Sequence, residues 1–315
     1  CFTPLNFIPL PLPPPPPRSR AQAACDAIVL AGVLRSNSVL TTLNVANGDI
    51  GDYEREEIGT ALLSNTNGRV GYCDAYGLKE GTGAVFSVDL KNKDQIRSRR
   101  AFTLFCGVLR ANSSLTCLTL ASVQPEHIDV LAQALATNTT LKELKLEQPS
   151  KTADTAVSSL PVQKLNGMEK VEMIDLSEAG LNQADGTCQP CHRHACGVVG
   201  AILGASANTS VRRVKIDPGG GADGGLIIDH LNRARKSCLS VLDVTGIGLS
   251  ERGGAKFFEL LIEGKCDFIT SLHLGSNDLT DQAVGRLMVE TMRSETCNIA
   301  TLDINNNEIG AGVIT

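Results

Sequence analysis

One short stretch of the chain brings three thiols and two imidazoles together. Residues 188–196 read Cys-Gln-Pro-Cys-His-Arg-His-Ala-Cys. Thiolates and imidazoles are the ligands that tetrahedral zinc prefers. The set that fits best is Cys188, Cys191, His194 and Cys196. Structural zinc sites usually join two separated pairs of ligands, whereas these four are crowded together. A redox-sensitive disulfide and a plain exposed loop therefore stay open as alternatives.

Other residue types that support catalysis are scattered along the chain. There is no Gly-x-Ser-x-Gly elbow and no His-Glu-x-x-His motif. The sequence identifies no Ser or Cys partner for His127, His230 or His273. We therefore predict that the protein is not an enzyme, and that zinc in the Cys/His stretch is the one cofactor to consider.

The elements that must position these residues follow a repeated pattern. Nine segments begin with an apolar residue, here called the anchor, and most carry apolar residues three and five positions later. The anchors are Leu40, Val70, Leu115, Leu141, Val171, Val211, Leu239, Ile269 and Ile299. The segments that begin at residues 269 and 299 match L-x-x-L-x-L-x-x-N-x-L, the leucine-rich repeat signature. Between segments, apolar residues recur at helical spacing, as Ile128, Leu131 and Leu135 do.

This pattern resembles the ribonuclease-inhibitor-like class of leucine-rich repeat proteins over about 280 of the 315 residues. The resemblance implies a right-handed α/β horseshoe, with parallel strands on the concave face, helices on the convex face and protein ligands held by the concave face. Because one unit cannot bury its own apolar face, we expect the nine anchor segments to lie side by side in one sheet along one core.

The expected boundaries follow from composition and spacing. Residues 1–20 hold a proline block, which favours an extended spacer or a docking peptide for an SH3- or WW-like groove. Residues 21–315 form the repeat domain, with insertions near 73–93 and 182–195. We expect a hairpin in the first insertion. Because no closing helix follows the last anchor segment, we also expect further repeats or a covering partner beyond it.

Asparagine precedes five anchors by three residues, at positions 37, 67, 112, 138 and 208. Asparagine suits a helix that ends and turns into a strand. Three of these residues begin an Asn-x-Ser/Thr glycosylation sequon, namely Asn112, Asn138 and Asn208. All three occupy the same place in the repeat. We therefore attribute them to the turn between helix and strand, and not to glycosylation of a secreted protein.

Composition excludes several classes of partner. The net charge is −5 and the pI is about 5.6, which argues against nucleic acid and against acidic membrane surfaces. No apolar run approaches the roughly 20 residues of a membrane helix, so we expect no membrane insertion. Six of the eleven cysteines are dispersed through the repeats, and they favour buried thiols in a reducing intracellular compartment, with the cytoplasm as the simplest choice and an organelle as the alternative.

The remaining surface is the inner face of the expected sheet, which side chains two and four positions after each anchor would line. The predicted partner-binding residues are Lys145, Asp175, Arg213, Lys215, Asp243, His273 and Asp303. Lys145, Arg213 and Lys215 would form a cationic cluster. The leading hypothesis is a non-enzymatic protein–protein interaction scaffold, a subunit of a larger assembly. The alternative is a regulatory or sensor protein whose Cys/His stretch binds zinc or responds to redox state.

Overall fold

The structure is a computed structural model, and it describes eleven parts of the chain. These are residues 20–45, 50–80, 84–91, 96–148, 156–176, 190–206, 208–216, 229, 231–249, 251–280 and 284–310. For residues 20–23, 156 and 190–194, only the backbone is described. The predicted proline-rich segment, apart from Arg20, and the cysteine at position 188 lie outside the described residues.

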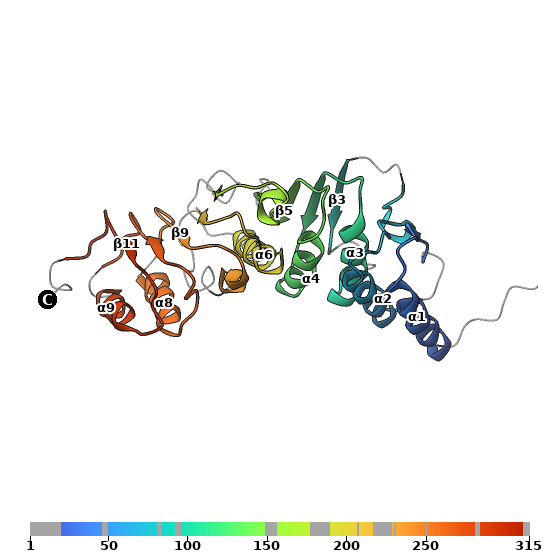
Figure 1. The fold of residues 1–315 in the computed structure, drawn as a ribbon, viewed down its shortest axis with the longest axis horizontal. Coiled ribbons are helices and arrows are strands. Elements are labelled where there is room, and N and C mark those ends of the chain that lie inside the picture. The colour runs from blue at the N-terminus through green and yellow to red at the C-terminus, as the bar shows by residue number, and fades with distance from the viewer. Residues whose placement is uncertain are drawn as a thin grey trace, which may run out of the picture.

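Strands lie along one side of the molecule and helices along the other, in chain order from α1 to α9 (Figure 1). The helices are α1 (Arg20–Leu34), α2 (Asp52–Ser64), α3 (Arg99–Ala111), α4 (Pro125–Leu135), α5 (Val162–Leu165), α6 (Pro190–Ser206), α8 (Glu251–Ile262) and α9 (Arg286–Arg293). Two short 3-10 helices are η1 (Asp74–Tyr76) and η2 (Asn232–Lys236). The chain is therefore a mixed α/β protein with a strand layer and a helix layer.

Each of the nine anchors is followed by a strand that begins two residues later. These strands are β1 (Thr42–Leu43), β2 (Tyr72–Cys73), β4 (Cys117–Ala121), β5 (Glu143–Gln148), β7 (Met173–Asp175), β8 (Arg213–Lys215), β9 (Val241–Asp243), β10 (Ser271–His273) and β11 (Thr301–Asp303). Where they pair with one another, they pair in parallel. The apolar spacing therefore predicted the strand positions correctly.

The expectation of a single sheet is wrong for the described residues, because the strands form three sheets. β1 and β2 form one, β3 to β6 form another, and β7 to β11 form the last. Two strands without an anchor form the two ends of the second sheet. β3 (Val85–Asp89) pairs in parallel with β4, and β6 (Ala156–Pro161) runs antiparallel beside β5. The hairpin expected near residues 73–93 is limited to a tight turn around η1, where Cys73 and Leu78 form an antiparallel bridge with backbone hydrogen bonds of 2.7 and 3.2 Å, and the parallel strand β3 follows.

One apolar core nevertheless runs beneath all three sheets. Side chains three positions after the anchors are fully buried in the middle of the chain, as at Leu118, Leu144 and Val214. Their neighbours in the core come from the helices, and one connected cluster spans Ala27 to Met288. Leu40, the first anchor, is 38% exposed because no described unit covers it.

In several units, an asparagine side chain ties the end of a helix to the unit before it. Asn138 accepts from the backbone N–H of Leu141 and donates to the carbonyl oxygens of Leu109 and Asn112. The Asn112 and Asn208 side chains are hydrogen bonded in the same way, and both are buried. The hydroxyl that completes each sequon, on Ser114, Thr140 or Ser210, donates to the oxygen of the same asparagine.

The prediction for Asn67 is wrong. Asn67 is exposed, and Asn65 donates in its place to the carbonyl oxygens of Leu34 and Asn37, at 2.7 and 2.8 Å. In the unit of Val171, Asn166 has the same role. In both units the asparagine lies five residues before the anchor, because a glycine-containing turn adds two residues.

Candidate functional site

Five charged or titratable side chains stand in one row across the β7–β11 sheet. The pairing register places Asp175 beside Lys215, Lys215 beside Asp243, Asp243 beside His273, and His273 beside Asp303. A second row, two residues earlier on each strand, contains Met173, Arg213, Val241, Ser271 and Thr301. We call these two rows together the strand face. Six of the seven predicted partner-binding residues lie on it.

The tightest ion pair on the strand face joins Arg213 of β8 to Asp243 of β9, with 2.5 Å between Nη2 and Oδ2. Asp243 is 5% exposed, and its other oxygen accepts from the backbone N–H of Thr245. Burial alone would raise the pKa of Asp243, but the hydrogen bonds from Arg213 and Thr245 outweigh it and hold that pKa below the ordinary 3.8. This pair is therefore a structural element of the sheet.

The ion pair at the other end of the row has a longer contact distance and is more exposed to solvent. Lys215 Nζ lies 3.4 Å from Asp175 Oδ2, and the two side chains are 34% and 40% exposed. Exposed pairs of this kind contribute little to stability, so both side chains can exchange this contact for a partner. Met173 stands beside them in the same sheet and is 47% exposed.

His273 lies between a serine and a carboxylate. Its Nε2 is 3.2 Å from Ser271 Oγ, and its Nδ1 is 3.6 Å from Asp303 Oδ2. Ser271 belongs to the same strand and Asp303 to the neighbouring strand. The sequence had identified no partner for His273. The available signal was the Ser-x-His spacing, because side chains two apart on a strand share a face.

Lys145 is separated from the other predicted residues. It lies on β5 in the sheet of β3 to β6, and its Nζ is 3.6 Å from Glu143 Oε2. Ser159 of β6 donates to the other carboxylate oxygen at 2.5 Å. That hydrogen bond is the main reason why the pKa of Glu143 is lowered. The three cations are thus divided between two sheets, and each one faces a carboxylate.

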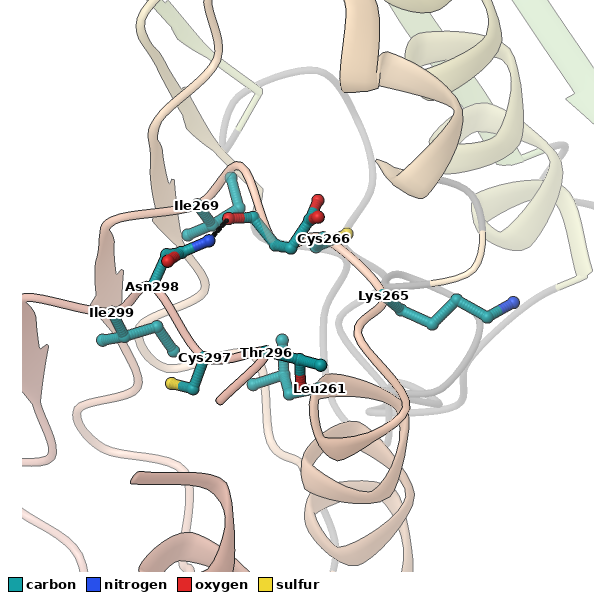
Figure 2. Close-up of a pocket in the computed structure, with 9 residues that line it drawn as sticks. Leu261, Lys265, Cys266, Ile269, Thr296, Cys297, Asn298 and Ile299 are labelled. Atoms are coloured by element: carbon teal, nitrogen blue, oxygen red, sulfur yellow. Dashed lines mark hydrogen bonds between the residues drawn. The ribbon is translucent and has the colours of Figure 1, made fainter. Parts of the chain in front are cut away.

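Two pockets lie among the described residues. A cavity of about 10 Å³ lies between the end of α8 and the turn before β11, where Asn298 donates to the carbonyl oxygen of Asp267 at 2.7 Å. In Figure 2, the Lys265 side chain points away from this cavity. The volume admits one water molecule at most. An open hollow of about 360 Å³ lies on the helix side, between α4, α6 and η2.

The Cys/His stretch is partly helical, because α6 begins at Pro190. The described residues include no group of three His, Cys, Asp or Glu side chains that could hold a metal ion. The side chains of Cys191 and His194 are outside them, as is Cys188. Cys196 is 4% exposed and packs in the core.

Several other thiols are buried, as the composition suggested. Cys73, Cys106 and Cys266 are each at most 1% exposed. Burial raises the pKa of all three, to about 12 for Cys266. Since the thiolate is the reactive form, these three side chains serve as small apolar groups.

The fold defines a mixed α/β protein with parallel sheets. No helix among the described residues is long and apolar enough to cross a membrane. No protein-family model matches the chain, and no curated protein matches it.

Proposed function

We propose that this chain is a leucine-rich repeat solenoid that acts as a protein-binding scaffold within a larger intracellular assembly. Support for the solenoid comes from the nine strands that each begin two residues after an anchor, backed by helices and one core. The observation that carries the binding function is the strand face, which presents in-register side chains over five adjacent strands. Repeat proteins use open surfaces of this kind to hold partners.

The contacts divide the strand face into fixed and available residues. Arg213 and Asp243 hold one another and keep the sheet in register. Lys215 and Asp175 are 34% and 40% exposed, and they give a partner charges of both signs. Met173, on the same strand as Asp175, adds an exposed apolar contact. A partner of this face therefore needs complementary charges beside an apolar contact.

A charge swap tests this function without breaking the local ion pair. In the double variant Asp175→Lys/Lys215→Asp, the pair is kept and the charge pattern offered to a partner is inverted. Affinity purification from cell extract, followed by quantitative mass spectrometry, would compare this variant with the unchanged chain. We expect the proteins captured by the strand face to fall at least tenfold, because reversed charges at a rim repel the original partner.

The matched control is a swap on the helix side. Lys256 and Glu259 form an exposed pair on α8, with 3.1 Å between Nζ and Oε2. The variant Lys256→Glu/Glu259→Lys should retain the captured proteins. If the strand-face swap retained all of them, or the helix-side swap lost them, the strand face would not be the binding surface.

A further inference from the structure

We propose that Ser271, His273 and Asp303 form a hydrolytic site on the strand face, in which Ser271 accepts an acyl group from a small ester. This inference goes beyond protein binding and does not depend on it. The three side chains come from two neighbouring strands, β10 and β11, whose register aligns Ser271 with Thr301 and His273 with Asp303. Nothing in the repeat pattern itself requires these residue types.

The order of contacts is that of a nucleophile, a base and an orienting group. Ser271 Oγ lies 3.2 Å from His273 Nε2, within hydrogen-bond distance. The opposite ring nitrogen, Nδ1, lies 3.6 Å from Asp303 Oδ2. Nucleophile–base pairs are activated when a third group holds the base in this way, and such contacts are often loose before a substrate binds.

Asp303 is itself held in place. Its Oδ1 accepts from the backbone N–H of Asn305 at 3.1 Å, which leaves Oδ2 to face the imidazole. A carboxylate beside Nδ1 favours the neutral tautomer that carries its proton there. Nε2 is then free of a proton and can accept the one on Ser271.

The carboxylate of Asp243, on the other side of His273, does not compete with Asp303 for the imidazole. Asp243 is adjacent in the register, but Arg213 occupies its Oδ2 and the Thr245 backbone its Oδ1. Only one of the two carboxylates therefore faces the imidazole, and one oriented carboxylate favours one tautomer of the ring. Two equivalent carboxylates would leave the ring without a defined direction.

The surroundings limit the substrate. The His273 and Asp303 side chains are 25% and 37% exposed, so the site opens on the strand face rather than into a pocket. Thr301 stands beside Ser271 in the register of β11 and is exposed, so we assign its hydroxyl as the donor to a developing oxyanion. One hydroxyl stabilises an oxyanion less than a preorganised pair of donors does. The substrate class is therefore small esters with good leaving groups.

The reaction balances as an ester hydrolysis. The Ser271 oxygen forms a bond to the acyl carbon as its proton passes to His273 Nε2. The bond from the acyl carbon to the leaving oxygen then breaks, and that oxygen takes the proton from His273. Water repeats the sequence on the acyl-serine, so one ester and one water give one acid and one alcohol, with Ser271 restored.

Covalent labelling tests the site directly. The purified chain would be treated with an aryl fluorophosphonate, which phosphonylates activated serines, and each serine would be followed by peptide mass spectrometry. We expect Ser271 to react on the order of 100-fold faster than Ser276, because general-base assistance is worth that much. Ser276 is the internal reference, since it is exposed and belongs to the same unit. Release of nitrophenol from p-nitrophenyl acetate should be lost in Ser271→Ala.

Two substitutions separate activation from mere exposure. His273→Gln should bring the labelling of Ser271 down to that of Ser276, and Asp303→Asn should lower it at least tenfold. Glu259→Gln, at an exposed position on α8, should leave it unchanged. Circular dichroism would show whether each variant is folded. If His273→Gln does not fold, the labelling of Ser271 in Asp303→Asn tests the proposal. Equal labelling of Ser271 and Ser276 in the unchanged chain would overturn the proposal, as would labelling that neither substitution lowers.

Discussion

The side-chain amide of Asn138 donates to the backbone carbonyl of Leu109 at 2.7 Å and so joins the end of one helix to the turn of the next unit. Its second N–H donates to Asn112, and its oxygen accepts from the backbone of Thr140 and Leu141. All four contacts are lost together if the amide is removed. They lie at a position that is 1% exposed, where water cannot replace them.

We predict that Asn138→Ala lowers the free energy of unfolding by about 3 kcal/mol, because buried backbone groups lose their partners. Urea denaturation of the purified variant would measure this. Asn67→Ala is the matched control, since Asn67 has the same sequence position relative to its anchor but is exposed. Its cost should stay within about 0.5 kcal/mol. Equal costs for the two variants would contradict the assigned role.

Two helical glycines should respond in opposite directions to the same substitution. A Cβ at Gly204 of α6 would overlap the carbonyl oxygen of Arg233 in η2, whereas a Cβ at Gly32 of α1 meets nothing within 4 Å. We expect Gly204→Ala to destabilise the fold by about 2 kcal/mol and Gly32→Ala to stabilise it by up to about 1 kcal/mol. Thermal unfolding would check both. A neutral Gly204→Ala would mean that η2 does not pack against α6 as described.

The strands were predictable because their register depends on local apolar spacing. Leu144, for example, marks its strand through its distance from Leu141 alone. The division into three sheets was not predictable in this way. The alternation from Val85 to Asp89 indicates a strand but not which neighbour it joins, and Ala156–Pro161 carries no anchor. Both depend on contacts between distant segments.

His127 should make stability depend on pH. It is 1% exposed, and its Nδ1 accepts from the backbone N–H of Gln124 at the start of α4. Burial lowers its pKa below the ordinary 6.5, so in that range the unfolded chain binds a proton that the folded chain does not. The free energy of unfolding should therefore fall as the pH drops through 6.5, by up to about 1.4 kcal/mol for each unit of pKa difference.

Urea titrations above and below pH 6.5 would measure this dependence. The variant His127→Gln should remove part of the slope, while Asn67→Ala, which removes no titratable group, should keep it. An identical slope in His127→Gln would show that another group is responsible.

The two ion pairs of the strand face should differ in their effect on stability. Asp243→Asn should cost about 2 kcal/mol, because Asp243 is buried and Arg213 would lose its partner. Asp175→Asn should cost less than about 0.5 kcal/mol, since that pair is exposed. Because the folded pKa of Asp243 is below 3.8, its contribution is present above that pH and lost as the pH falls through the folded value. Comparable costs at neutral pH would contradict the division into fixed and available residues.

The candidate site was predictable only as a row of positions. Spacing from the anchors placed His273 and Asp303 on one face, and the structure confirms that placement. The spacing could not show that Arg213 forms an ion pair with Asp243, or that Ser271 contacts His273. These contacts join side chains on strands about thirty residues apart, or depend on side-chain torsions, and neither is encoded by periodicity.

The three sequons have a practical consequence for how the chain can be produced. An oligosaccharyltransferase attaches sugar to an asparagine side-chain nitrogen before a chain has folded, and the linkage replaces one of its two N–H groups. At Asn138 both N–H groups are already needed inside the protein. A chain glycosylated there would lose a donor and would have to place a bulky sugar where no room exists, so a host that lacks this enzyme is the appropriate source of folded material.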